Sequence, residues 1–320
     1  MDIVRNFPNA VIVFHHDDTD GICAAFIIKQ KYDNSLSDSD WDRNVTCIPC
    51  NYGEKYNLQF FKDKVAENES EDLKNIIYMV DYAIQPNDEM IKFWNWCNAM
   101  GYELVWIDHH ITAIENIGHY DISGLRNIKE AGCMNVWNYM HQTEISPMIL
   151  RYVNDFDIWN KNSIYSWEKT LFPLVYFLES LGSDLNNNEG ELVKTLNACF
   201  ADNKNTDNII KIGQYIAKFI NNQYNRSLRR IKEVEWNGYK CLILNSSFRG
   251  SEQFSQYKSE DGTPADLMIV WSYDGKKYTF SIYTEKNNIN VGQICHSYFN
   301  GGGHKGAGGG CSSKFPFYEI

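Results

Sequence analysis

Short apolar runs in the N-terminal half of the sequence each end in acidic or histidine residues. These runs begin at residues 11, 76 and 104, and they are followed by His15 to Asp20, by Asp81 and by Asp108 to His110. A further strand is expected over 45–51, and a helix opens at Pro86 and ends at Gly101. Solid apolar runs joined by helices predict a mainly parallel sheet whose two faces are covered by helices.

The pattern changes near residue 131, first to helices and then to a smaller unit of strands. Helices are expected over 131–141, 147–153, 168–181, 189–200 and 206–231. Strands are expected over 239–245, 267–273 and 277–283, with a short helix over 291–299. We therefore predict an α/β protein with a first domain over residues 1–200, a helical linker over 201–235 and a smaller α+β domain over 236–320. A length of 320 residues suits two domains.

The charge of the chain limits its partners. A net charge of −11 and a pI near 5.2 leave no broad basic surface for long duplex nucleic acid. Short anionic substrates stay compatible, because a bound metal supplies local positive charge. The basic run Arg226, Arg229, Arg230 and Lys232 suits the end of the long helix, and we interpret it as a solvated helix end.

Cysteine usage and hydropathy predict a cytoplasmic protein. Nine cysteines are scattered through the chain, which is typical of reduced thiols. Cys47 and Cys50 lie within an expected strand, so we interpret them as packing thiols rather than a redox or zinc pair. Residues Met1 to Asn6 lack the order of a signal peptide, and no apolar run is long enough to cross a membrane.

The first strand end carries a dense set of metal-ligating side chains. Asp18 and Asp20 alternate around Thr19, so an extended loop before a helix at Gly21 would point both carboxylates the same way. His16 is close enough to join them. Carboxylate oxygen mixed with imidazole nitrogen suits Mn²⁺, Fe²⁺, Co²⁺ or Zn²⁺. The alternative is an acidic helix cap without a metal.

Parallel strands would bring the three strand ends side by side, gathering at least four carboxylates and three imidazoles. A further candidate lies in the segment 154–157, which follows the apolar residues 149–153. So many carboxylates need compensating cations. Two divalent metals about 3.5–4 Å apart would compensate them, and such pairs serve in-line displacement at phosphorus. The glycine of Ala131-Gly132-Cys133 fits either a phosphate on the helix N-terminus or close helix packing.

The motifs together resemble the signatures of the DHH phosphoesterase superfamily. The resemblance rests on His16-x-Asp18-x-Asp20-Gly21, on the strand-end Asp81, on Asp108-His109-His110 and on Gly301-Gly302-Gly303-His304, which is similar to the DHHA1 glycine motif. A histidine directly before the x-Asp-x-Asp-Gly core is typical of the NrnB-like branch of short-oligonucleotide nucleases and phosphodiesterases. The resemblance implies a DHH domain, a helical linker and a DHHA1 domain, with the active site in the cleft between the domains.

The resemblance also implies a role for each motif residue, with two Mn²⁺ as cofactors, or Mg²⁺ or Co²⁺ in their place. One Mn²⁺ would be held by His16 and Asp18, and the other by Asp20 and His109, with Asp81 bridging the two. A fourth-motif aspartate would complete the second metal: Asp157 is favoured, with Asp155 next. His110 would contact the scissile phosphate, and Asp108 would orient the histidine pair. His15 competes with His16, because other branches place their histidine at the position of Phe14.

The expected substrate grip lies in the second domain. The resemblance implies that Gly302, Gly303 and His304 bind the far end of the substrate, and His304 with Lys305 adds donors or charge. Tyr283 stands where many DHHA1 domains carry an arginine; it could stack on a base or hydrogen-bond a phosphate. Arg249 is a candidate to replace that arginine.

Three functions are compatible with these residues. The favoured one is a Mn²⁺-dependent exonuclease-like phosphodiesterase that cuts a short single-stranded oligonucleotide or dinucleotide into nucleoside 5′-monophosphates. The second is a hydrolase for a cyclic or linear dinucleotide, 3′-phosphoadenosine 5′-phosphate or pyrophosphate. The third is a nucleotide binder without activity, which is disfavoured because each core ligand type is present. The sequence does not fix the oligomeric state; a homodimer is one option.

Overall fold

A four-stranded parallel sheet forms the centre of the first of two structural units. The computed structural model describes residues 10–33, 44–52, 55–69, 75–142 and 144–317, and the chain divides into Met1–Ala217 and Lys218–Ile320. The sheet order is β2-β1-β3-β4, and all three pairings are parallel. The strands are β1 (Ala10–His16), β2 (Asn44–Cys50), β3 (Ile76–Val80) and β4 (Glu103–Ile107). The predicted parallel α/β fold is confirmed, with the three strand ends on one edge of the sheet.

Alternate residues of β1 belong to two different hydrophobic cores, because successive side chains of a strand point to opposite faces. Val11 and Val13 pack in one core, whereas Ile12 and Phe14 pack in the other. Each of these four side chains is at most 1% exposed. The central strand is therefore buried on both faces, which explains why it has no polar alternation until His15.

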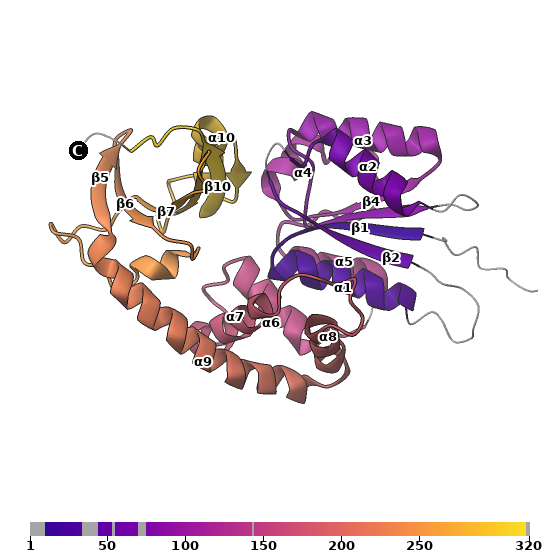
Figure 1. Ribbon diagram of the computed structural model, residues 1–320, viewed down its shortest axis with the longest axis horizontal. Coiled ribbons are helices and arrows are strands. Elements are labelled where there is room, and N and C mark those ends of the chain that lie inside the picture. Colours follow the sequence, from indigo (N-terminus) through magenta and orange to yellow (C-terminus); the bar gives the residue numbers. More distant parts are fainter. Residues whose placement is uncertain (1–9, 34–43, 53–54, 70–74, 143, 318–320) are drawn as a thin grey trace, which may run out of the picture. The chain divides into compact units, whose positions relative to one another are not determined.

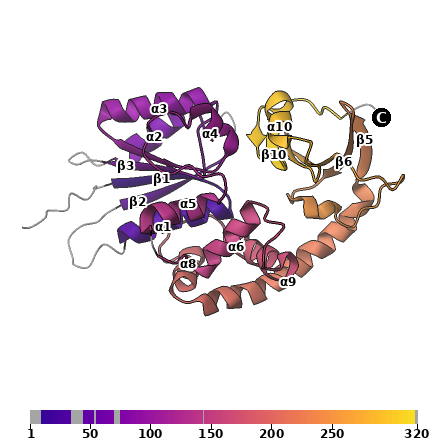
Figure 2. The same cartoon turned by 180° about the vertical axis from the view of Figure 1, so that it is seen from behind.

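Helices cover both faces of this sheet (Figure 1). On one face lie α2 (Leu58–Asn68), α3 (Asn87–Met100) and α4 (Ile111–Ile117). On the other face lie α1 (Thr19–Asp33) and α5 (Gly132–His141), and the view from behind shows the same two layers (Figure 2). Gly101 ends α3 in the left-handed conformation at φ 75°, as expected of a C-terminal glycine.

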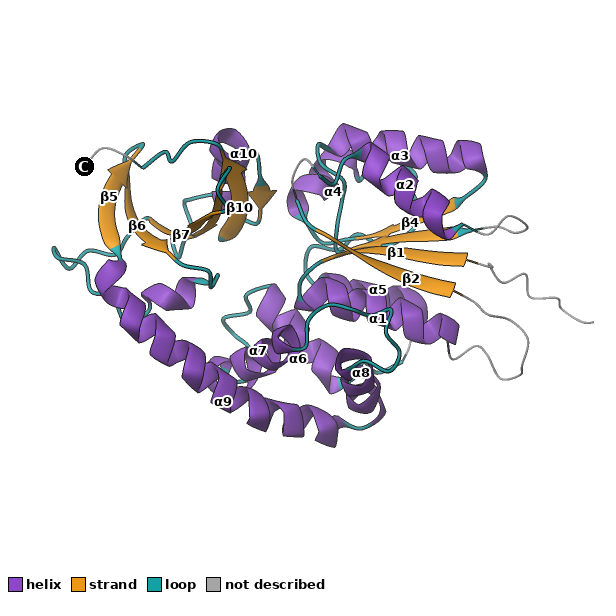
Figure 3. Cartoon of the chain, in the orientation of Figure 1, coloured by secondary structure: helices purple, strands orange, loops and turns teal. Residues whose placement is uncertain are grey.

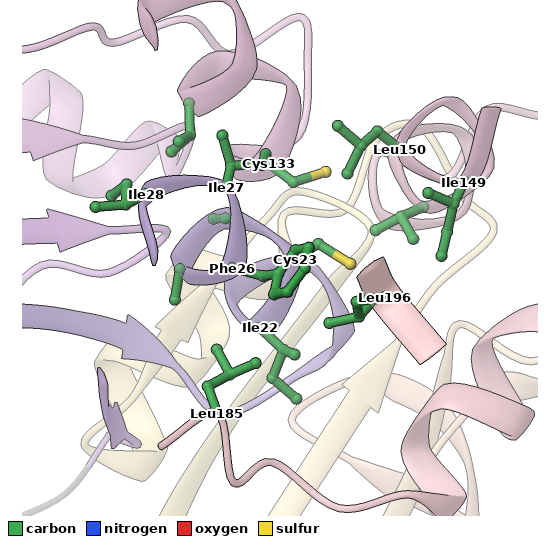
Figure 4. Packing of buried hydrophobic residues seen from close by; sticks show 14 of the residues in the cluster. Ile22, Cys23, Phe26, Ile27, Ile28, Cys133, Ile149, Leu150, Leu185 and Leu196 are labelled. Atoms are coloured by element: carbon green, nitrogen blue, oxygen red, sulfur yellow. The ribbon is translucent and has the colours of Figure 1, made fainter. Parts of the chain in front are cut away.

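More helices pack against α1 and extend its core. They are α6 (Met148–Asp157), a π-helical turn (Trp167–Leu171), α7 (Phe172–Ser180) and α8 (Glu191–Ala201). Figure 4 shows Cys23 and Phe26 of α1 beside Leu150 of α6 and Leu196 of α8. This packing matters for function, because α1, α5 and α6 each carry residues of the site described below.

The second unit is a six-stranded mixed sheet that follows the long helix α9 (Asn203–Ser227) and a 3₁₀ turn (Leu228–Arg230). The sheet order is β5-β6-β7-β8-β10-β9, in which only β6 and β7 pair in parallel. Its strands are β5 (Lys232–Trp236), β6 (Tyr239–Asn245), β7 (Leu267–Tyr273), β8 (Tyr278–Tyr283), β9 (Gly302–Gly303) and β10 (Ala307–Ser312). A 3₁₀ turn (Ser251–Phe254) and helix α10 (Val291–Phe299) complete it. Figure 3 distinguishes these strands and helices by colour.

The division of the chain falls within α9, inside the segment expected as a linker. The predicted domain bounds and the active site between the domains stay predictions. All nine cysteines are free thiols, and eight are buried, as expected for Cys47 and Cys50. Across the described ranges, no helix combines the length and the apolar character needed to span a bilayer. The prediction for Met1 to Asn6 lies outside the described residues.

Candidate metal centre

The carboxyl edge of the parallel sheet gathers the acidic and histidine motifs of the first unit. His16 is the last residue of β1, Asp81 follows β3, and Asp108 follows β4. Because β3 pairs with both β1 and β4, these ends are neighbours. Ligands of open α/β sheets bind at this edge. Among the groups of motif residues whose ligand atoms lie within 4.8 Å of one another, two matter most here, His16–Asp18–Asp81 and Asp20–His109–Asp157.

Asp81 lies between the two groups. Its carboxylate is 1% exposed, and neither oxygen has a hydrogen-bond partner. Oδ1 is 3.1 Å from His109 Nε2, and Oδ2 is 3.8 Å from His16 Nδ1. Burial, together with the charge of Asp20, raises the pKa of Asp81 well above its usual value. Asp81 also adopts the left-handed backbone conformation at φ 52°, which aspartate tolerates better than most residues.

In the first group, a helix cap directs the carboxylate of Asp18. Its Oδ1 accepts a hydrogen bond of 2.9 Å from the backbone N–H of Gly21, and its Oδ2 lies 2.6 Å from His16 Nδ1 without the geometry of a hydrogen bond. Burial favours the neutral acid, but the His16 imidazole more than offsets it and holds the pKa of Asp18 below its usual value. Gly21 is required here, because a Cβ would lie 2.2 Å from the carbonyl oxygen of His16.

The expected extended loop through Asp18 and Asp20 is wrong. Helix α1 begins at Thr19 rather than near Gly21, so Asp20 lies in its first turn. Asp18 caps this helix by accepting a hydrogen bond from the N–H of Gly21, so the helix begins earlier than expected. The two carboxylates therefore face different partners, one toward His16 and the other toward His109. Asp18 is thus a helix cap and also one of the clustered acids, and the metal site stays a prediction.

In the second group, the N-terminus of α5 fixes Asp20. The N–H groups of Gly132 and Cys133 donate to its two oxygens at 2.6 Å and 2.9 Å. These amides thus hold a carboxylate of the protein. A Cβ on Gly132 would lie 2.6 Å from Asp81 Cβ and 2.9 Å from Asp20 Oδ2, so close packing explains this glycine. Burial, with the charge of Asp157, raises the pKa of Asp20 to about 6.

Asp157 is the last residue of α6 and points at the same imidazole. Its Oδ2 lies 3.3 Å from His109 Nε2 and has no hydrogen-bond partner. Burial, with the charge of Asp18, raises its pKa to about 7. Asp155 differs, because it accepts hydrogen bonds from Ser163 and Asn160 at 2.5 Å and 3.1 Å and is absent from the ligand groups found among the described residues.

Asp108 supports the two histidines that follow it. Its Oδ1 accepts from the backbone N–H groups of His109 and His110 at 2.7 Å and 3.1 Å and lies 2.8 Å from His110 Nδ1. The indole N–H of Trp106 donates to Oδ2 at 3.2 Å. Burial favours a neutral imidazole, but the charge of Asp108 outweighs it and raises the pKa of His110 to about 9. His110 therefore carries a proton at neutral pH.

His15 lies outside these groups. It is fully buried, and its Nδ1 is 2.8 Å from the backbone oxygen of His16. Burial lowers the pKa of His15 to about 4, so the ring is neutral. It belongs to none of the ligand groups in the described part of the chain. His15 therefore does not lie where it could replace His16 as a metal ligand.

Sequence reasoning missed Tyr52, which lies beside the two groups. Its ring stacks on Tyr82 with centroids 5.0 Å apart and lies 5.4 Å from His16 and 6.2 Å from His110. With 41% of its surface exposed, it offers an aromatic face to solvent. One signal was available: Tyr52 follows β2, which neighbours β1, so it had to lie near the same sheet edge.

The chemistry of the donor set fits divalent cations. Within the described residues, no lysine or arginine forms an ion pair with any of the four clustered carboxylates, Asp18, Asp20, Asp81 and Asp157. Three buried acceptor oxygens, both of Asp81 and Oδ2 of Asp157, lack hydrogen bonds. Buried polar groups of native proteins are normally satisfied, so these oxygens require a cation or protons. Mixed carboxylate and imidazole ligands suit Mn²⁺ and its neighbours.

The candidate substrate residues of the second unit cluster around the glycine run. Gly302 and Gly303 form β9, and the N–H of His304 donates to the carbonyl of Ala307 at 2.7 Å, closing the turn between β9 and β10. His304 is half-buried and Lys305 is exposed. Tyr283 ends β8, and its hydroxyl accepts from the N–H of Gly250 at 2.9 Å. This bond holds the exposed Arg249 segment beside Tyr283.

The fold and the site define a class: an α/β protein with clustered metal-ligating residues at the carboxyl edge of a parallel sheet, followed by a second sheet unit. No protein-family model and no curated protein matches the sequence. An exopolyphosphatase-related protein from Bacteroides fragilis has a similar structure, with a TM-score of 0.53 and 15% identity over 98% of this chain and 88% of that one. This similarity shows the fold alone, and the fold is the α/β arrangement with a second sheet unit that the sequence predicts.

Two further structures align over most of this chain. One is a pGpG-specific phosphodiesterase, PggH from Vibrio cholerae, with a TM-score of 0.48 and 14% identity over 95% of this chain and 93% of that one. The other is RecJ from Thermus thermophilus in complex with Mn²⁺, with a TM-score of 0.47 and 13% identity over 94% of this chain and 49% of that one.

Proposed function

We propose that this chain is a Mn²⁺-dependent phosphodiesterase of the NrnB-like kind that converts short single-stranded oligonucleotides into nucleoside 5′-monophosphates. The observation that carries the proposal is Asp81, a buried carboxylate without hydrogen bonds between two sets of ligand atoms. A carboxylate shared by two ligand sets would hold two divalent cations close together, which is the arrangement that two-metal phosphoesterases use. The motifs His16-x-Asp18-x-Asp20-Gly21 and Asp108-His109-His110 support the same interpretation.

Each ligand set would hold one cation. His16 and Asp18 belong to one set and Asp20, His109 and Asp157 to the other, with Asp81 shared. When bound, a pair of divalent cations neutralises phosphoryl oxygens and activates water for attack at phosphorus. The protein supplies the positions: the α5 N-terminus fixes Asp20 and the Gly21 N–H fixes Asp18. Such outer contacts preserve the ligand geometry.

His110 is the proposed partner of the scissile phosphate. Its ring is oriented by the contact of Nδ1 with Asp108, and its raised pKa of about 9 keeps it protonated at neutral pH. A protonated imidazole stabilises the negative charge that grows on a phosphoryl oxygen during the displacement. Asp108 acts through His110, so it is a positioning residue.

The second unit is proposed to hold the remote end of the substrate. Backbone N–H groups of Gly302 and Gly303 can approach an anion closely, because no side chain intervenes. A Cβ on Gly302 would meet nothing within 4 Å, so its surroundings are open. His304 and Lys305 follow in the turn, and Arg249 with Tyr283 forms a second polar group. Contacts of this kind would favour the binding of an oligonucleotide over the binding of a single phosphate.

A substrate panel with Mn²⁺ tests the proposal. It contains pApA, a labelled five-nucleotide RNA, 3′-phosphoadenosine 5′-phosphate, a cyclic dinucleotide, pyrophosphate and a short polyphosphate. We expect release of 5′-monophosphates from the first two. Asp81→Asn removes the shared carboxylate and should abolish this release, whereas Asp17→Asn changes an exposed acid of the same segment and should not. Absence of turnover on every diester would refute the proposal.

The alternative function is hydrolysis of a small phosphate compound. The exopolyphosphatase-related protein of similar fold is the specific reason to include pyrophosphate and polyphosphate. The metal centre alone does not choose between these substrates, because both reactions attack phosphorus in the same way. Turnover of polyphosphate without turnover of pApA would establish the alternative.

A further inference from the structure

The second unit contains a polar cavity of about 410 Å³ at the carboxyl ends of the parallel strands β6 and β7. Its walls come from the end of α9, from the segment after β6 and from the end of β7. The volume lies within the range of roughly 300–1,000 Å³ that is typical of small-molecule sites. All lining residues belong to this unit, so the cavity is described without reference to the first unit.

The cavity is positively charged. Among the described residues that line it, Arg226 and Arg230 are the only charged ones, and none carries a carboxylate. Both arginines are exposed, and within the described residues neither forms an ion pair with an acid. The basic run of which they are part was expected to be a solvated helix end. The run is exposed, as that interpretation expects, and two of its members also line a shared hollow, where guanidinium groups are suited to bind a phosphate.

Aromatic rings and an unpaired acceptor complete the walls. Tyr273 is 51% exposed and Phe248 is 38% exposed, so both rings offer a face for stacking. The side chain of Gln253 is 1% exposed; its Nε2 donates to the carbonyl of Phe248 at 2.8 Å. That bond fixes the amide orientation and leaves Oε1 without a hydrogen-bond partner. An unsatisfied buried acceptor is unfavourable, so a ligand that donates an N–H would stabilise it.

The cavity is distinct from the glycine run. Tyr273, in the cavity wall, pairs with Tyr278 at one end of the β7–β8 ladder, whereas Met268 pairs with Tyr283 at the other end. Ala307 lies opposite Tyr283, and Gly303 pairs with Gly308. Gly302 and Gly303 are therefore at the far end of the same strands. Arg249 and Tyr283 of the proposed substrate grip adjoin the cavity without lining it, since Arg249 follows Phe248 and the N–H of Gly250 donates to Tyr283.

We propose that this cavity is a second binding site, specific for a nucleoside monophosphate. The phosphate is bound by Arg226 and Arg230, the base stacks on Tyr273 or Phe248, and an N–H of the base donates to Gln253 Oε1. The combination of two cations, exposed aromatic faces and a lone acceptor matches the three parts of a nucleotide better than it matches phosphate or a nucleoside alone. This site is independent of hydrolysis at the metal centre.

Equilibrium titration of the full chain with AMP in EDTA tests this proposal. EDTA removes metal from the first unit, and Asp81→Asn and His304→Ala variants check that neither proposed substrate site contributes. We expect AMP to bind to the wild type and to both of these variants equally. Inorganic phosphate and adenosine, titrated separately, should each bind at least about tenfold more weakly, because each lacks contacts that the nucleotide makes.

The double variant Arg226→Gln/Arg230→Gln should weaken AMP binding at least about tenfold. Arg229→Gln is the control for loss of a neighbouring charge: it removes one positive charge next to Arg230, from a side chain that does not line the cavity, and should bind like the wild type. Thermal melting checks that the variants fold. Three results would overturn the proposal: no AMP binding by the wild type at millimolar concentration, unchanged binding by the folded double variant, or phosphate binding as tight as AMP binding.

Discussion

Replacing Asp81 by asparagine should have opposite effects on stability and on activity. Asparagine keeps the size of the side chain, and it tolerates the left-handed conformation that Asp81 adopts at φ 52°. What changes is the charge. Without metal, the Asp81 carboxylate is buried with neither oxygen hydrogen-bonded, and burial raises its pKa well above the usual value. A neutral amide removes this unfavourable burial and can accept a hydrogen bond at the Oδ1 position, 3.1 Å from His109 Nε2.

The size of both effects follows from the structure. An unsatisfied buried group costs about 1–3 kcal/mol, and more when it is charged, so Asp81→Asn should stabilise the metal-free protein by roughly that amount. For a unit of this size, such a gain raises Tm by about 2–12 °C. Activity should fall by more than the ~100-fold loss typical of outer-sphere changes at metal sites, because Asp81 is a proposed direct ligand.

Paired melting experiments measure the stability change. In EDTA, the variant should melt above the wild type. Saturating Mn²⁺, at about 100 times its Kd, should stabilise the wild type by about 2.7 kcal/mol per site and reverse the order. Hydrolysis of pApA measures the activity of the same samples. A variant that melts below the wild type in EDTA and retains turnover would refute the reasoning, because Asp81 would then be neither an uncompensated carboxylate nor a metal ligand.

The remaining predictions concern the neighbours of the metal centre and the second unit. Gly132→Ala places a Cβ 2.6 Å from Asp81 Cβ; Mn²⁺ affinity measured by calorimetry should fall at least about tenfold, and an unchanged Kd would count against the close packing of α5. Tyr52→Ala removes an exposed ring 5.4 Å from His16, so KM should rise for pApA but not for pyrophosphate, and equal changes would exclude base stacking. His304→Ala should raise KM for dinucleotides more than for a chromogenic monoester; equal effects would mean that His304 does not hold the remote end of the substrate.

The parallel sheet could be predicted because its strands are buried on both faces. Runs such as Ile76–Val80 therefore consist of apolar and aromatic residues, and the change to Asp81 marks the end of the strand. The neighbouring positions of the strand ends followed from the parallel pairing alone. This is why residues from three distant segments could be grouped from the sequence before any contact was known.

Local backbone geometry was harder to predict. Asp18 was expected in an extended loop, but its capping bond to Gly21 starts α1 at Thr19. A helix cap and an extended loop differ here by one hydrogen bond, and the alternation of residue types along the sequence does not show whether that bond forms. The strand Ala307–Ser312 was not predicted, because its glycines show no apolar alternation. Residues 232–235 of the strand Lys232–Trp236 were expected to be part of the linker, since charged residues are frequent there.

The cavity of the second unit could not be predicted from the sequence either. Arg226 and Arg230 lie near the end of a helix, and helix ends are commonly basic in order to offset the macrodipole. Only the tertiary structure brings them to the same hollow as Tyr273 and Gln253, which come from β7 and from the turn after β6. The composition therefore predicts that the chain as a whole is acidic, but it does not predict this local region of positive charge.

The central claim is that two divalent cations bind at the sheet edge. Anomalous diffraction from crystals grown with Mn²⁺ tests it most directly. We predict two manganese peaks about 3.5–4 Å apart, one at His16 and Asp18 and one at Asp20, His109 and Asp157, with Asp81 contacting both. A map without anomalous density among these side chains, at a manganese concentration that supports turnover, would contradict the account.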